Sequence, residues 1–209
     1  DCDPLQTVAE GKTAVKYLVV DGAGELMVLG QTGVNEAFRS GHLPDETLSD
    51  ADVLHLTSQH PETAARLAER ASEAGVTVSF DPGRRLGQRD YAETLARADV
   101  VFLNDREAAT ALDECAQQGA ETLVLKHGPR GAEVRTPSET FTHPGFAVET
   151  VDTTGAGDAF AAGFLASRLR NDDYDEALAV ANACGALAAQ SSGARLDISW
   201  TAVSELVGH

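Results

Sequence analysis

Over most of its length, this chain alternates short apolar runs with stretches that have helical spacing. The apolar runs are 53–56, 76–80, 100–103, 122–125 and 132–135, and the helical stretches are 61–74, 90–98, 105–117, 156–169 and 174–190. Strands that alternate with helices pair mainly in parallel, with the helices on the faces of the sheet. We therefore expect an α/β fold with a mostly parallel central sheet flanked by helices, and 209 residues are enough for one such domain.

The first part of the chain has a different pattern. Two strand-like runs, 14–20 and 26–30, flank the glycine-containing turn 21–25, which is typical of a β-hairpin. We expect this hairpin to form a small sheet of its own.

The chain is strongly acidic. It has 33 acidic and 16 basic residues, a formal net charge of -17, and Lys occurs only at Lys12, Lys16 and Lys126. Such a surface repels nucleic acid and anionic membranes, so we expect neither as a partner. An ordinary acidic cytosolic enzyme and a protein of a high-salt cytoplasm both fit, and the scarcity of Lys favours the second.

Targeting and redox signals point to the cytoplasm. No apolar run approaches the roughly 20 residues that span a bilayer, and residues 1–4 lack the basic start of a signal peptide. Met27 is the only methionine, so we expect the chain to be part of a longer one. Cys2, Cys115 and Cys184 are widely spaced, which predicts reduced thiols and no zinc site.

The strongest chemical signal is Asp152-Thr153-Thr154-Gly155-Ala156-Gly157-Asp158, which leads directly into an apolar helix. Small residues let backbone N–H groups approach an anion, and a helix N-terminus adds free donors and a positive dipole end. A carboxylate at Asp158 could accept the proton of an attacking hydroxyl. The alternative is a tight turn in which Asp158 only caps the helix.

The stretch 152–164 resembles the C-terminal signature of the ribokinase-like (PfkB) carbohydrate kinases, and the resemblance continues along nearly the whole chain. It implies a ribokinase-like fold, with about 12–35 as part of a β lid and about 50–209 as the nucleotide-binding part. It also implies that Asp158 is the general base and that the amides of Gly155, Ala156 and Gly157 form the anion hole for the γ-phosphate. The family's domain begins with about a further third, so we expect 1–209 to be its C-terminal two-thirds, with exposed sheet edges.

The same resemblance assigns the nucleotide site. Lys126, Gly128 and Gly131 match the family's nucleotide loop, and Asn182 matches the position beside the adenine. A plain hairpin turn is the alternative for the loop.

Asn104 and Glu107 match the family's N-x-x-E motif, which organises magnesium and phosphate. Magnesium prefers oxygen ligands and keeps its waters, which agrees with this assignment. Read alone, the same two residues also fit a helix capping box.

A monovalent-cation loop is the third implied site. Its oxygens would come from Asp152, Thr154, Ala188, Ser191 and Gly193, and potassium would be the ion.

The resemblance implies a sugar acceptor bound by Asn35, Arg85 and Asp158. Arg85 lies in 81–85, which is similar to the family's D-P-N-x-R stretch, although Gly83 replaces the usual Asn. Ribose, fructose and 2-keto-3-deoxygluconate all fit. An Arg pairs well with the carboxylate of the last, whereas the stretch 33–35, which resembles the G-A-N of ribokinase relatives, favours ribose or fructose. A homodimer through the lid strands is also expected.

The sequence also allows three other functions to be compared with a sugar kinase. A nucleoside kinase on the same fold and an inactive sugar- or nucleotide-binding relative stay open, although the intact Asp158 disfavours the second. A dinucleotide-binding dehydrogenase is poorly supported, because its glycine loop should follow the first strand.

The charge leads to a prediction about salt. At about 0.1 M salt the Debye length is roughly 10 Å, and at about 1 M it is roughly 3 Å, so molar salt removes most repulsion between surface carboxylates. The melting temperature of the full-length protein should therefore rise steadily from dilute buffer to molar KCl. A flat melting temperature would contradict the high-salt interpretation.

Comparing KCl with NaCl separates screening from ion binding. Both salts should raise the melting temperature equally by screening, whereas only KCl should support full activity if the loop near Ser191 binds potassium. Equal activity in the two salts would remove the potassium site.

Overall fold

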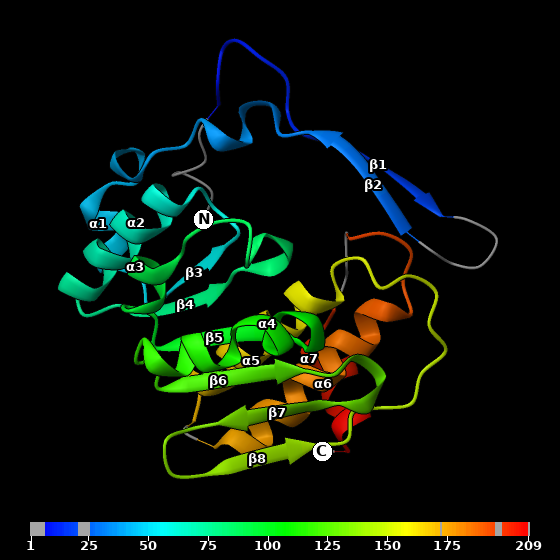
Figure 1. Ribbon diagram of the computed structural model, residues 1–209. Helices are drawn as coiled ribbons and strands as arrows, with labels where there is room; N and C mark the ends of the chain where they lie inside the picture. The colour runs from blue at the N-terminus through cyan, green and yellow to red at the C-terminus, as the bar shows by residue number, and fades with distance from the viewer. Residues whose placement is uncertain (1–6, 21–25, 172, 195–197, 209) are drawn as a thin grey trace.

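The computed structural model describes residues 7–20, 26–171, 173–194 and 198–208, and within them the strands form two sheets. The small sheet pairs β1 (Val15–Val20) antiparallel to β2 (Leu26–Gln31) and stands away from the rest of the molecule (Figure 1). The predicted hairpin is thus confirmed, while its turn at 21–25 lies outside the described residues.

The large sheet has the strand order β3-β4-β5-β6-β7-β8. Its strands are β3 (Val53–Thr57), β4 (Thr77–Asp81), β5 (Val100–Asn104), β6 (Thr122–Lys126), β7 (Ala132–Arg135) and β8 (Thr140–His143). The first four are parallel, and β7 and β8 are antiparallel to their neighbours. Among the described residues β3 pairs only with β4, so it forms an edge of the sheet, as expected.

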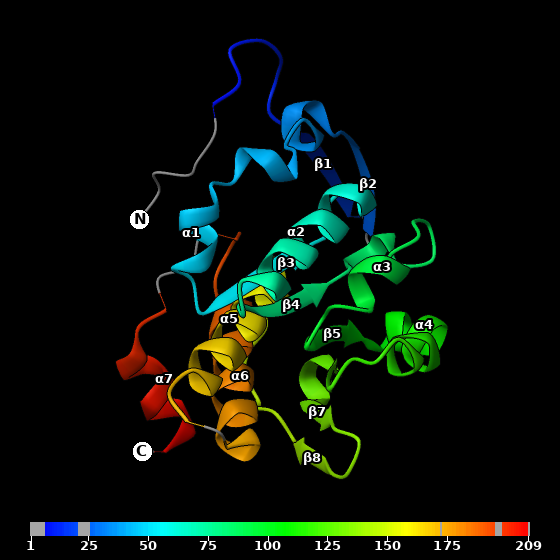
Figure 2. The same ribbon diagram turned by 90° about the vertical axis from the view of Figure 1, so that its left-hand side faces the viewer.

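Helices cover both faces of this sheet (Figure 2). They are α1 (Asp45–Ser49), α2 (Pro61–Glu73), α3 (Ala92–Leu95), α4 (Asp105–Gln117), α5 (Ala156–Arg168), α6 (Tyr174–Ala189) and α7 (Trp200–Val207). None of those described is long and apolar enough to cross a membrane.

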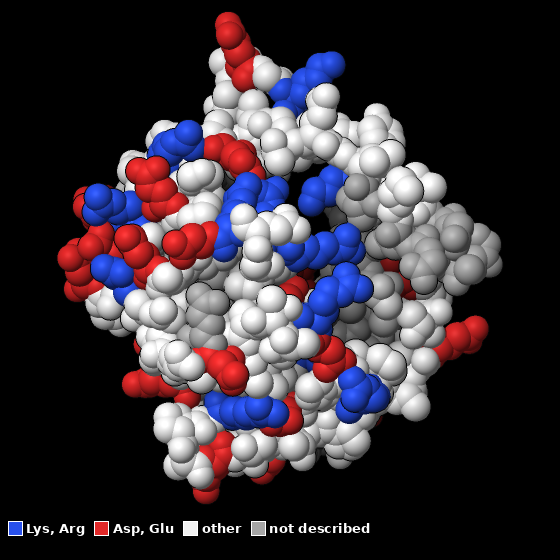
Figure 3. Space-filling model, viewed as in Figure 1, with Lys and Arg blue, Asp and Glu red and all other residues white. Residues whose placement is uncertain are grey.

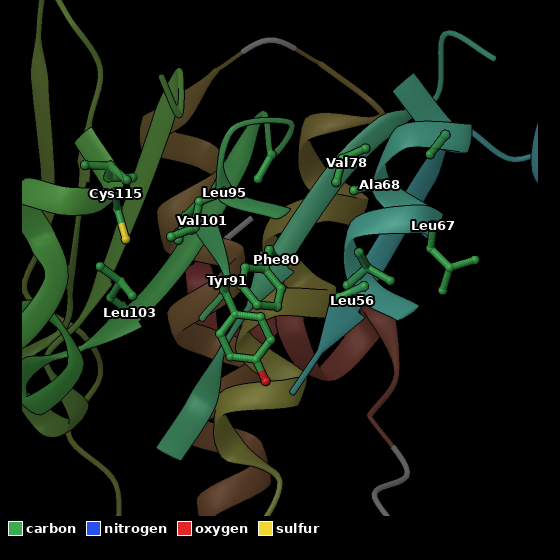
Figure 4. Packing of buried hydrophobic residues seen from close by; sticks show 14 of the residues in the cluster. Leu56, Leu67, Ala68, Val78, Phe80, Tyr91, Leu95, Val101, Leu103 and Cys115 are labelled. Carbon is green, nitrogen blue, oxygen red and sulfur yellow. The ribbon is translucent and has the colours of Figure 1, made fainter. Parts of the chain in front are cut away.

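Side chains that alternate along the strands divide the core in two. On β5, Val101 and Leu103 point into the cluster shared with α2, α3 and α4, whereas Phe102 points into the cluster shared with α5 and α6. Figure 4 shows the first cluster, where Phe80 and Tyr91 meet edge to face with ring centroids 5.0 Å apart.

Most sequence predictions of elements are confirmed. The range 105–117 is helix α4 as predicted, and the apolar face expected for 61–74 is buried on α2. The helical pattern at 90–98 gives only the short helix α3. It begins where Oδ1 of Asp90 accepts from the N–H of Ala92 over 3.0 Å, and a turn at 96–97 ends it. Cys115 and Cys184 are buried thiols, and Cys2 lies outside the described residues.

The parallel strands matter most for the site. The last residues of β3 and β4, Thr57 and Asp81, are register partners, and so are the last residues of β5 and β6, Asn104 and Lys126. The carboxyl ends of four strands therefore lie along one edge, which is where α/β sheets bind ligands.

Candidate active site

Helix α5 begins at the glycine-rich turn. Its N-cap is Gly155, with φ +80°, a conformation that favours glycine. Asp158 is exposed in the first turn of the helix. The N–H of Ala156 donates to the carbonyl of Thr153 over 3.2 Å, so this amide already has an acceptor. Of the three predicted anion-hole amides, those of Gly155 and Gly157 are therefore the easier to use.

A cation lies beside this helix start. A Cβ on Gly157 would be 3.6 Å from Nζ of Lys126, which ends β6. Nζ also donates to the carboxylate of Asp81, and the two side chains are only 15% and 13% exposed. The amine is thus held in place at the edge of the sheet, 5.8 Å from the ring centroid of Phe102.

Asn104 and Glu107 form a reciprocal helix cap. The N–H of Glu107 donates to Oδ1 of Asn104 over 3.0 Å, and the N–H of Asn104 donates to Oε2 of Glu107 over 2.9 Å. Burial is the main cause that raises the pKa of Glu107, and the carboxylate of Asp81 adds to it. The capping alternative is therefore realised, and Glu107 still has a second oxygen for a ligand.

An apolar cavity of about 690 Å³ lies between the nucleotide loop and the helices α5 and α6. Lys126, Gly128, Gly131 and Asn182 all line it, so the structure brings the predicted nucleotide residues together. Gly131 has φ +88°, and a Cβ there would lie 1.9 Å from the carbonyl oxygen of His143, so a side chain cannot be accommodated. Nδ2 of the buried Asn182 donates to the carbonyl of Leu178 over 2.7 Å, which fixes its amide.

A second cavity, of about 760 Å³, adjoins the first and is called the polar cavity here because most of its lining residues are polar or charged. Asn104 and Lys126 line both, while Arg84, Asp105 and Glu107 line only the second of these two. This arrangement suits a phosphate chain with a hydrated metal. Among the described residues no three His, Cys, Asp or Glu side chains are grouped to hold an ion. Magnesium is often bound by only one or two carboxylates together with phosphate and water, which Glu107 and a phosphate chain here could supply.

A third cavity, of about 470 Å³, lies beneath the lid. Lys16, Asn35, Arg84 and Arg85 are among its lining residues, so two of the three predicted substrate residues meet here. The third, Asp158, lines none of these three cavities. Figure 3 shows Lys and Arg side chains gathered around a hollow between the small sheet and the large one.

Glu36 holds two of the arginines. Its Oε1 accepts hydrogen bonds from Nη1 of Arg85 and, over 2.6 Å, from Nη2 of Arg89. The hydrogen bonds from Arg85 and Arg89 lower the pKa of Glu36 to about 2, so the carboxylate is ionised at neutral pH. Asn35 is also engaged, because its Oδ1 accepts from the N–H of Ala14 over 3.0 Å.

The residues of the predicted cation loop gather around Asp152. Its Oδ1 accepts from the N–H and the hydroxyl of Thr154 over 2.9 and 2.7 Å, and its Oδ2 accepts from the N–H of Gly193 over 2.9 Å. The N–H of Ser191 donates to the carbonyl of Ala188 over 3.0 Å. These bonds close the loop, and the potassium ion stays a prediction.

Sequence reasoning missed several residues of this region. Asp81 and Arg84 both lie in the stretch 81–85, but the motif gives neither of them a role, and no motif includes Lys16 or Glu36. Their importance comes from contacts between segments that are far apart in the chain.

The chain is similar to known carbohydrate kinases over nearly its whole length. Residues 1–201 match the pfkB family of carbohydrate kinases. The chain belongs to this family. It is 56% identical over 200 residues to an ATP-dependent ribose-1-phosphate kinase of Halopiger xanaduensis, covering 93% of this chain and 68% of the relative. It is 32% identical over 184 residues to a cytidine kinase of Thermococcus kodakarensis, covering 81% of this chain and 66% of that protein.

Solved structures agree on the fold. The fructokinase of Vibrio cholerae O395, crystallised with fructose, ADP and calcium, aligns with a TM-score of 0.84 at 24% identity, covering 99% of this chain and 77% of that one. The ribokinase-like fold is therefore confirmed, and the chain is a carbohydrate kinase of the pfkB family, an enzyme that transfers phosphate to an alcohol group.

Glu107 provides a test that separates its two roles. Glu107→Gln keeps an oxygen that can accept from the N–H of Asn104 but removes the negative charge. The magnesium concentration for half-maximal rate should rise severalfold, because the charge that attracts the hydrated ion is lost, while the melting temperature should change little.

Glu62→Gln is the matched control, since Glu62 is an exposed acid in the first turn of α2. If Glu107→Gln leaves the magnesium dependence unchanged, Glu107 serves only as a cap.

Proposed function

We propose that this chain carries the nucleotide-binding and catalytic part of an ATP-dependent kinase that transfers the γ-phosphate of MgATP to a sugar hydroxyl. One observation supports this most strongly. The start of α5, with Asp158 in its first turn, meets Lys126 at the place where the nucleotide cavity adjoins the polar cavity. A transferring phosphate at this place would lie between a helix N-terminus and a fixed cation.

In the proposed reaction, the sugar hydroxyl oxygen attacks the γ-phosphorus and gives its proton to the carboxylate of Asp158. The bond between the γ-phosphorus and the bridging oxygen breaks, and ADP leaves with the electron pair. The amides at Gly155 and Gly157 stabilise the charge on the transferring group, since they lie at the positive end of the helix. The N–H of Ala156 can also contact the phosphate once its hydrogen bond to the carbonyl of Thr153 is broken.

Magnesium would be held through water and phosphate near Asn104 and Glu107, and when bound it neutralises charge on the phosphate chain. The ammonium group of Lys126, beside the start of α5, would contribute a further positive charge next to the transferring phosphate. We also propose that the loop around Asp152 binds potassium. The hydrogen bonds from Thr154 and Gly193 to Asp152 support this, because they bring the predicted ligand residues together.

We place ribose 1-phosphate first among the acceptors, because the relative that is 56% identical is named for it. The keto-acid 2-keto-3-deoxygluconate is less favoured than ribose 1-phosphate, since Glu36 already binds the guanidinium of Arg85 that would pair with the carboxylate of the keto-acid. Ribose, fructose and a nucleoside remain alternative acceptors, and the cytidine kinase relative keeps the last of them open.

The lid strands support the proposal of a homodimer. Val15, Tyr17, Val19, Met27 and Leu29 share one face of the β1–β2 sheet by their register, and each is between 46% and 66% exposed. A second copy of the chain that covers this face would remove apolar surface from water.

The base is tested by Asp158→Asn, which keeps the size of the side chain but cannot accept a proton. Turnover should fall by roughly 10²–10⁴-fold, the usual contribution of general base catalysis, while the Kd for ATP stays within about twofold. Steady-state kinetics and nucleotide titration on the full-length protein measure both.

Asp175→Asn is the control, because Asp175 is likewise an exposed acid in the first turn of a helix, α6. Near-normal turnover by Asp158→Asn would rule out Asp158 as the base.

A further inference from the structure

The cavity beneath the lid is cationic, in contrast to the chain as a whole. Lys16, Arg84 and Arg85 line it together with a single carboxylate, Glu36, which gives these lining residues a net charge of +2. The whole chain carries a net charge of -17 with only 16 basic residues. A neutral sugar needs hydrogen bonds but no excess of positive charge, so this cavity is suited to an anion.

Lys16 is directed by the strand opposite it. Gly30 is its register partner on β2, and a Cβ on Gly30 would lie 3.2 Å from Cγ of Lys16 and 2.4 Å from the carbonyl oxygen of Val15. The stem of Lys16 thus occupies the space that glycine leaves free, on the face of the lid opposite the exposed side chain of Tyr17. This packing leads the amine to the cavity that it lines.

Arg84 is directed by the turn that follows β4. Gly83 has φ +58°, and a Cβ there would lie 2.8 Å from Oγ of Ser58, so glycine is the residue that fits this turn. The N–H of Gly83 donates to Oδ1 of Asp81 over 3.1 Å and anchors the turn. Arg84 follows directly and lines both the lid cavity and the polar cavity next to it.

The two cations are also available. Glu36 engages Arg85 and Arg89, whereas among the described residues neither Lys16 nor Arg84 has a carboxylate partner. An ammonium on the lid and a guanidinium on the main body therefore flank one cavity with charge that the protein leaves uncompensated there.

We propose that Lys16 and Arg84 bind the phosphate group of a phosphorylated sugar acceptor, and that they select it over the same sugar without phosphate. Guanidinium and ammonium groups both form charge-assisted hydrogen bonds to phosphate. Arg85, fixed by Glu36, borders the same space and orients the sugar. This proposal rests on the proposed function for the reaction and for ribose 1-phosphate as the acceptor.

The first experiment measures kinetics of the full-length protein with ribose 1-phosphate and with ribose. Lys16→Met keeps the stem over Gly30 and removes the charge, and Arg84→Gln removes the other charge. Each should raise the KM for ribose 1-phosphate by roughly ten- to hundredfold, with a smaller change in the KM for ribose. Lys16→Met should also leave the KM for ATP within about twofold, since Lys16 lines only the lid cavity of the three. Lys16→Arg should restore most of the affinity, since it restores the charge.

Lys12→Met is the matched control, because Lys12 is exposed and lines none of the three cavities. An unchanged KM for ribose 1-phosphate in Lys16→Met would overturn the proposal. A higher KM for ATP in Arg84→Gln, without a change for ribose 1-phosphate, would overturn the part assigned to Arg84 and place this residue at the nucleotide.

The second experiment separates this inference from the proposed function. Calorimetric titration of ribose 1-phosphate into Asp158→Asn, with and without Lys16→Met, measures binding without turnover, and melting curves confirm that both variants are folded. Binding that depends on Lys16 supports the inference even if no acceptor is phosphorylated by the unmodified protein. Phosphorylation of ribose, with ribose 1-phosphate binding that is independent of Lys16, supports the kinase and overturns the inference.

Discussion

The carboxylate of Asp81 joins the two halves of the site. One oxygen accepts from the N–H of Gly83, which fixes the turn that carries Arg84, and the other accepts from Nζ of Lys126 beside the start of α5. Because this ion pair is largely buried, removal of either partner would leave a charge without compensation, which costs several kcal/mol in other proteins, about 3–5. The proposed acceptor side and the proposed nucleotide side are therefore joined by one residue at the end of β4.

The sheet makes this arrangement possible. Parallel pairing from β3 to β6 brings the ends of four strands to one edge, and the glycine-rich start of α5 lies beside Lys126 at this edge.

The acidic surface adds a constraint on how anions reach this edge. A net charge of -17 repels ATP and sugar phosphates at a distance, so the fixed cations act at short range, and salt that shortens the Debye length weakens the repulsion.

Much of the fold could be predicted from the sequence, because helical and strand periodicity are local. The helix at 105–117 and the strand at 132–135 were predicted to the residue. The strand β8 and the helix α7 were not predicted, because each is short: four residues that are mostly polar, and eight residues at the end of the described chain. Asn104 and Glu107 show a different limit, because their spacing fits both a helix cap and a magnesium motif, and the structure shows the cap.

The candidate site could be predicted only where a motif marks it. Gly155, Gly157 and Asp158 stand together in the chain, whereas Lys16 and Arg84 are 68 positions apart and meet only through the lid. Asp81 has the same property, since its partner Lys126 is 45 positions away. Charge that is gathered by tertiary structure leaves no pattern in the sequence.

The most direct test of this account is a crystal structure of full-length Asp158→Asn with ribose 1-phosphate and a non-hydrolysable ATP analogue. The account predicts the acceptor phosphate within hydrogen-bond distance of Lys16 and Arg84, and a sugar hydroxyl within about 3.2 Å of the side chain at position 158 and facing the γ-phosphate. A sugar phosphate bound away from the lid cavity, or a side chain at 158 that points away from the hydroxyl, would contradict it.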